Sequence, residues 1–403
     1  MREEIFVKQK DGRKILKWSM KLKIAIDCRH VQFYHEGITR STINLISLLR
    51  NDFEFHALLC NRHIPVPELE QFPEVTLHYL GPSWSILDWL WENYSLVKLL
   101  SSLKPDIYHA PCTMGLPLKK ISGIRYMVTV HDLILKYFPS SYPFLGRLKW
   151  FVGIRVDVWR ADGIITISHF TKGLLCKQYK LSPKNVHVVP HSIATAFSDR
   201  RKEEETIKAV RARFALESDY IIYHGGFKPY KNVAKVIESY DAYRRTGEGR
   251  LKLCLVGKIN DVFKRYVQLS IDRTPFKSDI VTPGYVTDVD LSYLLSGAKC
   301  FLYLSKMEGF GFAPMEAMAC GVPVICAINS SMIETLGDAV QRVEDGEAPE
   351  EIAKKIRDVT VNNALTENLI EKGLAQASEF NHQRFQQEMK NAYLKIVGHA
   401  FDF

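Results

Sequence analysis

The stretch SKMEGFGFAPMEAMACGVPVI, residues 305–325, carries most of what the sequence predicts about this chain. Gly309 and Gly311 allow the backbone to approach a ligand closely, because glycine lacks a Cβ atom. Pro314 is expected in the first turn of a helix, where the missing N–H of proline is not needed. Glu316 is then expected in that first turn, close to unpaired backbone N–H groups that attract anions.

Two glutamates, Glu308 and Glu316, lie on either side of this glycine-rich turn. One carboxylate before the turn and another inside the helix can hold two polyols, while the amides between them hold a diphosphate. A nucleotide sugar has this shape. The pattern alone is also compatible with an ordinary turn between a strand and a helix, in which Glu316 only complements the helix dipole.

Length and composition favour a globular protein of two domains. The chain has 403 residues, of which 46% are apolar and 25% charged, and one core rarely organises so many. No apolar run reaches the roughly 20 residues of a membrane-spanning helix, and the charged N-terminus does not resemble a signal peptide. We therefore expect a cytoplasmic protein. The eight cysteines include no C-x-x-C pair, so we expect buried thiols and neither a disulfide framework nor a zinc site.

All of the net charge of +9 belongs to the first half of the chain. Residues 1–198 contain 26 Lys and Arg against 16 Asp and Glu, whereas residues 199–403 contain 28 against 29. The basic half is either a solvated surface with a basic N-terminal tail, or a surface that attracts anionic lipid headgroups or an anionic acceptor. Nucleic acid is a weaker third option, because no nucleic-acid-binding motif accompanies the charge.

Strand-like and helix-like segments alternate along residues 21–198, and the alternation begins again in residues 199–385. This pattern predicts two α/β domains with doubly wound parallel sheets. Ligand loops are expected at the carboxyl ends of the strands, so a cleft between the domains would be lined from both sides. The expected strands are residues 21–27, 54–60, 75–80, 106–110, 125–132, 163–168, 185–190, 220–226, 251–257, 279–286, 300–305, 322–327 and 339–344.

Changes in charge and pattern divide the chain into four segments. Residues 1–20 are expected to be a charged N-terminal extension, and Met20 is an alternative start of the chain. Residues 21–198 are expected to form the first domain and residues 199–385 the second. The helical segment 386–403 either closes the second domain or packs back on the first.

Two motifs point to a known family. They are EGFGFAPMEAMACGVPVI (308–325) and HGGFKPYKNV (224–233). Further stretches agree in the same order, namely TVHDLILKYFP, RADGIITISHFTK, VHVVPHSI, GYVTDVDLSYLLSGA and SSMIETLGDAV. Over roughly residues 21–395, the chain resembles the retaining glycosyltransferases of family four. The resemblance implies the α/β GT-B fold, with two Rossmann-like domains facing a central cleft.

The resemblance also implies a site for a nucleotide-sugar donor in the second domain. Glu316 is expected to bind the ribose hydroxyls through two hydrogen bonds, and Glu308 to contact hydroxyls of the transferred sugar. Lys231 matches the family's phosphate-binding lysine, which neutralises charge on the leaving diphosphate. The nucleobase is expected against the backbone of Val286. The other donor-binding residues that the resemblance implies are Gly37, Gly225, Gly226, Lys228, Gly309, Phe310, Gly311 and Phe312.

His131, in the motif TVHD, matches a family histidine that faces the donor sugar from the first domain. The expected catalytic residues are therefore His131, Lys231 and Glu308. No carboxylate is placed as a convincing nucleophile, so the course that the family implies is front-face substitution through an oxocarbenium-like state, with retention of configuration. The resemblance implies no metal and no cofactor.

The chain departs from the family pattern at several positions. Thr39 replaces a glycine in the loop after the first strand, and Gly226 and Tyr230 stand where the family commonly has an arginine. Lys228 can replace that positive charge but not its bidentate geometry. His191 stands where asparagine is usual, and we assign it no role.

We therefore expect a retaining hexosyltransferase, peripheral on the inner face of the cytoplasmic membrane. It would move a sugar from an NDP-sugar to a lipid-linked or surface-polysaccharide acceptor, such as a lipopolysaccharide intermediate. GDP-mannose is the favoured donor, because the P-x-K-N and EGFGxxxxE sequence motifs recur among bacterial mannosyltransferases. UDP-sugars are the next most favoured donors. The alternatives are an NDP-sugar epimerase or phosphorylase on the same fold, and a non-catalytic sugar-nucleotide-binding partner of a polysaccharide assembly. The sequence leaves the linkage and the oligomeric state open.

Overall fold

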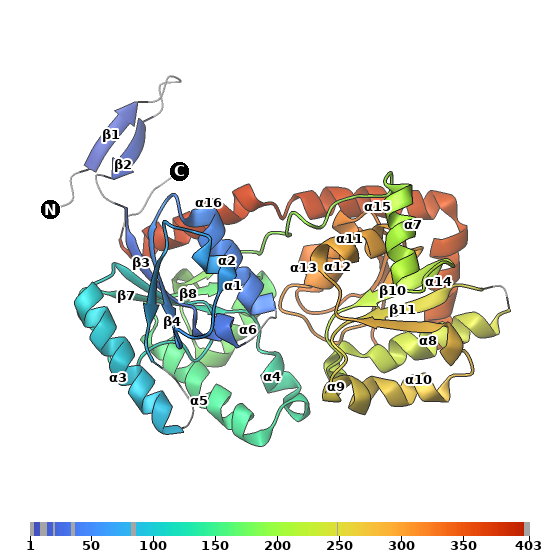
Figure 1. Ribbon diagram of the computed structural model, residues 1–403, viewed down its shortest axis with the longest axis horizontal. Coiled ribbons are helices and arrows are strands. Elements are labelled where there is room, and N and C mark those ends of the chain that lie inside the picture. The colour runs from blue at the N-terminus through green and yellow to red at the C-terminus, as the bar shows by residue number, and fades with distance from the viewer. Residues whose placement is uncertain are drawn as a thin grey trace.

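The structure is a computed structural model, drawn in Figure 1. It describes residues 4–8, 14–18, 21–33, 37–81, 86–247 and 249–398. Two α/β domains lie side by side, as the alternating sequence pattern predicts (Figure 1). A strand lies within each of the runs that the sequence analysis assigned to one. The alternative start at Met20 falls outside the described residues.

The N-terminal domain contains a parallel sheet that is seven-stranded in the described part of the chain. Across the sheet its strands are β5 (Thr76–Tyr79), β4 (Glu54–Leu59), β3 (Lys23–Asp27), β6 (Ile107–Ala110), β7 (Arg125–Val130), β8 (Gly163–Thr166) and β9 (Val186–Val188). The helices around it are α1 (Gly37–Leu49), α2 (Pro67–Glu70), α3 (Ile86–Leu103), α4 (Ile134–Tyr137), α5 (Phe144–Arg160) and α6 (His169–Tyr179).

The C-terminal domain contains a second parallel sheet, six-stranded among the described residues. Across the sheet its strands are β12 (Ile280–Gly284), β11 (Lys252–Val256), β10 (Tyr220–His224), β13 (Cys300–Tyr303), β14 (Val324–Ala327) and β15 (Gln341–Val343). Its helices are α7 (Glu204–Arg213), α8 (Val233–Arg245), α9 (Asp261–Phe263), α10 (Leu269–Arg273), α11 (Asp288–Ser296), α12 (Phe312–Ala319), α13 (Met332–Leu336), α14 (Pro349–Val361) and α15 (Asn363–Ser378).

Short segments with other helical geometry connect some of these elements. The 3₁₀ segments are η1 (Arg29–Gln32), η2 (Pro139–Ser141), η3 (Pro183–Asn185), η4 (Pro229–Lys231) and η6 (Lys277–Asp279), and a π-helical segment, η5, spans Lys264–Gln268. Of these, η4 matters most for the site, because it carries Lys231.

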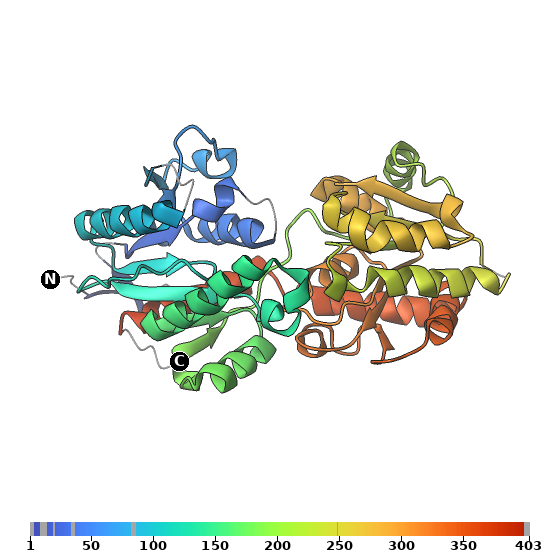
Figure 2. The same ribbon diagram turned by 90° about the horizontal axis from the view of Figure 1, so that it is seen from below.

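Helices cover both faces of each sheet (Figure 2). Every residue of β6, β8, β10 and β13 is buried, which explains why these strands are continuous apolar runs and not alternating ones. In the N-terminal domain the two faces form separate apolar clusters. Ile24 and Ile26 of β3 belong to one cluster, and Ala25 between them belongs to the other.

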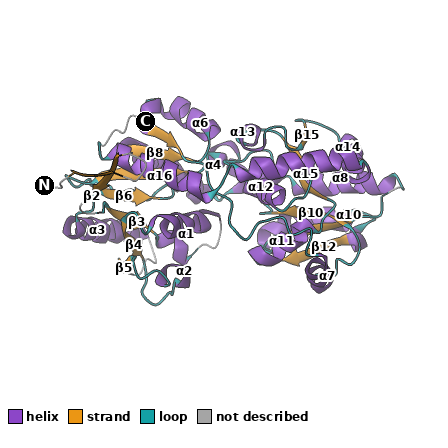
Figure 3. Ribbon diagram, turned by 90° about the horizontal axis from the view of Figure 1, so that it is seen from above, coloured by secondary structure: helices purple, strands orange, loops and turns teal. Residues whose placement is uncertain are grey.

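Helix α16 (His382–Ile396) leaves the C-terminal domain and packs on the N-terminal one, against α1. Its buried residues, Phe385, Met389, Ala392 and Tyr393, recur at helical spacing and join the N-terminal apolar cluster. Figure 3 shows α16 over the N-terminal strands and α15 over the C-terminal ones. This packing back on the first domain is one of the two alternatives that the sequence left open.

Strands β1 (Glu4–Lys8) and β2 (Lys14–Trp18) lie in the segment assigned as a charged extension. They pair antiparallel, with Glu4 opposite Trp18, and form a two-stranded ribbon separate from both larger sheets (Figure 1). The described part of the chain contains no helix that is both long and apolar enough to cross a membrane. All eight cysteines are free thiols.

Candidate functional site

The predicted donor loops meet at the carboxyl edge of the C-terminal sheet. Neighbouring strands β10 and β13 are separated by two other strands in the sequence, so the strand order reverses between them. Ligands of doubly wound sheets bind in the crevice at such a point. The loop after β10 contains Gly225 and Gly226 and leads to Lys231, and the loop after β13 contains Glu308.

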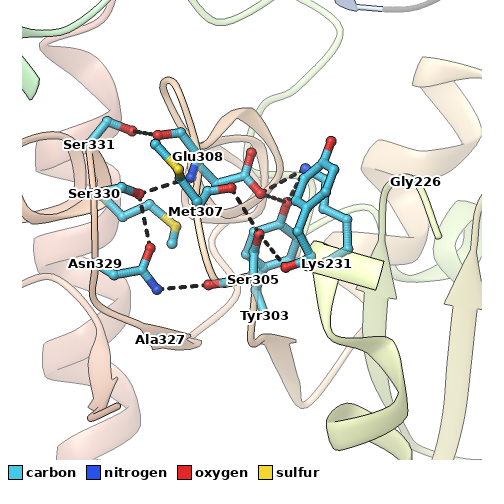
Figure 4. Close-up of polar contacts among 12 residues, drawn as sticks. Gly226, Lys231, Tyr303, Ser305, Met307, Glu308, Ala327, Asn329, Ser330 and Ser331 are labelled. Atoms are coloured by element: carbon cyan, nitrogen blue, oxygen red, sulfur yellow. Dashed lines mark hydrogen bonds and ion pairs between the residues drawn. The ribbon is translucent and has the colours of Figure 1, made fainter. Parts of the chain in front are cut away.

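Lys231, Tyr303 and Glu308 form a closed triangle of hydrogen bonds (Figure 4). Lys231 Nζ donates to Glu308 Oε1 at 2.7 Å and to Tyr303 Oη at 2.9 Å. Tyr303 Oη donates to the same Glu308 oxygen at 2.7 Å. Burial, together with the charge of Glu308, raises the pKa of the Tyr303 hydroxyl well above its usual range, so it remains a donor. An ammonium group and a carboxylate are thus held side by side at the switch point.

The backbone of Glu308 is fixed by the loop after β14. Ser330 Oγ accepts from the Glu308 N–H at 2.9 Å, and Ser331 Oγ donates to the Glu308 carbonyl at 2.9 Å (Figure 4). Asn329 Nδ2 donates to the carbonyl of Ser305, three residues before Glu308, at 2.8 Å. These hydrogen bonds fix the backbone of Glu308 on both sides. The position of its carboxylate therefore does not depend on the ion pair with Lys231 alone.

Glu316 lies deeper in α12 than the sequence suggested. The helix begins at Phe312, directly after Gly311, whose positive φ of 95° makes it the N-cap. Pro314 is therefore the third helical residue and Glu316 the fifth, so the expectation that Glu316 lies in the first turn is wrong. The left-handed conformation of Gly311 sets the start of the helix, not the proline.

The Glu316 carboxylate is buried between groups from both domains. Arg40 Nη1, from α1 of the N-terminal domain, donates to Glu316 Oε1 at 2.8 Å, and its Nη2 donates to Asp288 at 3.1 Å. His224 Nε2, at the end of β10, lies 3.4 Å from Glu316 Oε2. Burial raises the pKa of Glu316 to about 7, although the positive charge of Arg40 opposes this shift.

At Gly309 the turn lies against the backbone of the N-terminal domain. A Cβ atom at Gly309 would lie 2.4 Å from the His131 carbonyl oxygen and 2.9 Å from the Asp132 Cβ. Phe310 is buried beside it, and Phe312 stacks on His191 with ring centroids 4.9 Å apart. Gly309 is thus required by contact between the domains, in addition to any contact with a ligand.

His131 lies at this interface, but both of its ring nitrogens are engaged within the protein. Its Nε2 is 2.8 Å from the Pro111 carbonyl, which can only accept, so Nε2 carries the proton. Its Nδ1 then accepts from His191 Nε2 at 3.3 Å, and His191 Nδ1 accepts from Ser41 at 3.2 Å. The two imidazoles stack, with centroids 5.3 Å apart. Burial lowers the pKa of His131 to about 4, which keeps the ring neutral.

The remaining predicted residues occupy more varied positions. Gly37 begins α1, three residues before Arg40, and a Cβ there would meet open space. Gly225 has a positive φ of 141°, and Gly226 is exposed. The Lys228 ammonium lies 4.4 Å from the ring centroid of Tyr142 in the other domain. Val286 is buried in the apolar cluster of the C-terminal domain.

Two site residues, Arg40 and Tyr303, were missed by the sequence analysis. Arg40 directly follows Thr39, at the start of α1, but its partner Glu316 lies 276 residues away in the chain. Tyr303 ends an apolar strand and is indistinguishable by pattern from a core residue. His191, to which we assigned no role, contacts His131 and Phe312. Among the described residues, no group of three or more His, Cys, Asp and Glu side chains is arranged to hold a metal ion.

Comparisons with known proteins identify the family of this chain. The family model described as "Glycosyl transferases group 1" matches residues 181–376, and the one described as "Glycosyltransferase Family 4" matches residues 35–197. The chain therefore belongs to the glycosyltransferases of family four, and its two facing Rossmann-like domains are the GT-B fold.

Relatives and solved structures are similar over most of the chain. O-antigen chain mannosyltransferase B from Escherichia coli is 28% identical over 73% of this chain and 75% of its own length. O-antigen chain mannosyltransferase RfbU from Salmonella typhimurium is 24% identical over 72% of this chain and 77% of its own. The crystal structure of HepE from Anabaena, in complex with UDP and glucose, has a TM-score of 0.73 at 17% identity, covering 92% of this chain and 98% of that one. This structural likeness supports the fold.

Proposed function

We propose that this glycosyltransferase is a retaining, metal-independent mannosyltransferase that uses GDP-mannose. Its acceptor is a lipid-linked or surface-polysaccharide intermediate of O-antigen type, and it works in the cytoplasm at the inner face of the membrane. The curated relatives described above, which are named as O-antigen mannosyltransferases, support this choice of sugar and acceptor. The observation that carries the catalytic part is the triangle of Lys231, Tyr303 and Glu308 at the point where the strand order reverses.

The donor would bind mainly to the C-terminal domain. Glu316 accepts hydrogen bonds from the two ribose hydroxyls, which requires its ionised form. Lys231 and Tyr303 both contact Oε1 of Glu308, and the other carboxylate oxygen would accept from a sugar hydroxyl. The backbone after Glu308 follows the sugar and the diphosphate, and the base lies along the Val286 backbone.

Arg40 connects donor binding to the N-terminal domain. Its guanidinium contacts the same Glu316 carboxylate that the ribose would use, so a bound donor has to displace it. The displaced guanidinium is then free to pair with the diphosphate, where it supplies the bidentate cation that the family commonly places at the positions of Gly226 or Tyr230. Arg40 thus replaces that arginine from the opposite side of the interface.

The reaction would proceed on one face of the sugar. The bond between the sugar's anomeric carbon and the diphosphate oxygen breaks, and the acceptor oxygen bonds to the same face of that carbon. The acceptor's proton passes to the departing phosphate. Lys231 and Arg40 stabilise the negative charge that develops on the leaving diphosphate, and they are most effective where water is excluded.

A panel of sugar nucleotides tests this proposal. GDP-mannose, UDP-glucose and UDP-galactose are incubated with the protein and a membrane extract containing polyprenyl-linked acceptors, and free NDP and labelled glycolipid are measured. We expect GDP release and mannose transfer, both abolished by Lys231→Ala and by Glu316→Ala. The matched controls are Lys354→Ala and Glu371→Gln, which replace exposed residues of α14 and α15. A new NDP-sugar would indicate an epimerase, a sugar phosphate a phosphorylase, and tight binding without turnover a non-catalytic partner.

A further inference from the structure

Helix α5 of the N-terminal domain exposes an unusual amount of apolar surface. Of its 17 residues, Trp150, Ile154, Asp157 and Val158 are buried and hold it against the sheet. Six large apolar side chains on the same helix are exposed: Phe144, Leu145, Leu148, Phe151, Val152 and Trp159. Leu145 is 76% exposed and Trp159 80%. Exposed apolar patches of this kind mark interaction surfaces.

These side chains form one continuous stripe. At 100° per residue, Phe144, Phe151 and Leu148 fall within about 60° of one another, and Val152, Trp159 and Leu145 extend the stripe by about 60° more. The helix lies along the outer, lower edge of the N-terminal domain in Figure 1. It thus presents a second apolar face outward, where a surface helix usually carries polar residues.

The stripe is accompanied by positive charge and by no exposed acid. Arg155 lies within it, and Arg147 on one side and Lys149 and Arg160 on the other flank it. The single acidic residue of the helix, Asp157, is buried and accepts from the backbone N–H of Leu116. All three arginines of the helix lie over aromatic rings of the stripe: Arg147 over Phe144, Arg155 over Phe151 and Arg160 over Trp159. Apolar and aromatic side chains with arginines around them are typical of helices that lie in the lipid headgroup region.

The start of α5 lies beside the donor loop. Tyr142, two residues before the helix, contacts Lys228 of the C-terminal domain, and Lys228 precedes Lys231 by three residues. Helix α4, which contacts α5, carries Ile134 against Tyr230 and Met307 across the interface. A flat surface in contact with α5 would therefore reach the edge of the inter-domain site.

We propose that α5 docks this protein on an anionic phospholipid bilayer, with Phe144, Leu148 and Trp159 inserted into the headgroup region and the flanking arginines and Lys149 on lipid phosphates. The positive charge of this helix face attracts an anionic lipid surface and would repel a basic protein surface. No described helix is able to span a bilayer, so the attachment is peripheral. The lipid-linked acceptor belongs to the proposed function, and docking brings its saccharide to the site, but docking itself does not depend on glycosyl transfer.

Vesicle flotation of the full-length protein tests the docking. We expect binding to vesicles of phosphatidylcholine with 30% phosphatidylglycerol, weak binding to phosphatidylcholine alone, and release by high salt. The double variant Leu148→Glu/Trp159→Glu should lower the partition coefficient about tenfold or more. The double variant Arg147→Gln/Arg155→Gln should lower it about 25-fold, or about fivefold for each basic residue, which equals about 1 kcal/mol each.

Matched controls on the C-terminal domain separate this surface from general charge or hydrophobicity. Leu269→Glu/Val361→Glu replaces two comparably exposed apolar residues, and Lys208→Gln/Lys354→Gln removes two exposed charges. Both controls should bind vesicles like the wild type. All variants should keep the wild-type rate of donor hydrolysis in detergent, which separates a failure of docking from a failure of the proposed chemistry.

Three results would overturn the proposal. The first is equal partition of the wild type on anionic and neutral vesicles. The second is an equal loss of binding in the C-terminal controls. The third is a dimer in light scattering that Leu148→Glu/Trp159→Glu dissociates, since a second copy of the chain would then cover this face.

Discussion

Replacing Glu316 by glutamine should lower donor affinity without lowering stability. The carboxyl is buried, and burial raises its pKa from 4.5 to about 7. Because the pKa of this carboxyl is higher in the folded state than in the unfolded state, its ionisation lowers the free energy of unfolding. The loss grows as the pH rises from 4.5 to 7. At about 1.4 kcal/mol for each pH unit, this cost reaches about 3 kcal/mol above pH 7.

The amide of Glu316→Gln avoids this cost because it carries no charge. At pH 8 we expect the variant to be at least as stable as the wild type, with a gain of up to about 3 kcal/mol. Most of the gain should disappear at pH 5, where the wild-type carboxyl is protonated in the folded protein. Urea denaturation at the two pH values measures the difference.

Donor affinity should change in the opposite direction. Hydrogen bonds to a charged group contribute about 1 kcal/mol more than neutral ones, so replacing two of them costs about 2 kcal/mol, or about 30-fold in the dissociation constant. Isothermal titration with GDP-mannose at pH 8 measures this. Below pH 7 the wild type should lose affinity as Glu316 becomes protonated, and the variant should lose much less. A variant with lower stability and unchanged affinity would show that Glu316 only holds Arg40, and would refute the reasoning.

Three further predictions concern the same interface. Lys231→Met should lower the turnover number about 100- to 1,000-fold, since it removes a cation aimed at the leaving diphosphate, and steady-state rates that stay within tenfold of the wild type would contradict this. Arg40→Ala should shift the pH midpoint of donor binding upward, because the Arg40 charge lowers the Glu316 pKa, and an unchanged or lower midpoint would argue against their coupling. Gly309→Ala should force the domains apart at the His131 carbonyl, so we expect slower transfer with donor affinity retained and a larger radius in small-angle scattering. An unchanged radius and rate would show that the interface tolerates the methyl group.

Much of the fold could be predicted because its determinants are local. The strands of both sheets are short apolar runs bounded by polar or glycine-containing turns, and the buried parallel arrangement requires such runs. The glycine-rich turn was predicted from its own residue pattern and Lys231 from the family resemblance, and both lie in loops that follow strands β13 and β10. Pro314 does lie in the first turn of α12, but Glu316 does not, because the helix already begins at Phe312, after the left-handed Gly311.

The sequence by itself determined two doubly wound domains and the loops at their strand ends, since periodicity and turn residues act over a few positions. Only the tertiary structure brought Arg40 to Glu316 and Gly309 to His131, and it alone decided that α16 covers the N-terminal sheet. These contacts join residues that are far apart in the chain, and no local pattern specifies which distant partner a charge or an apolar face will meet. The packing of one domain against the other chooses that partner.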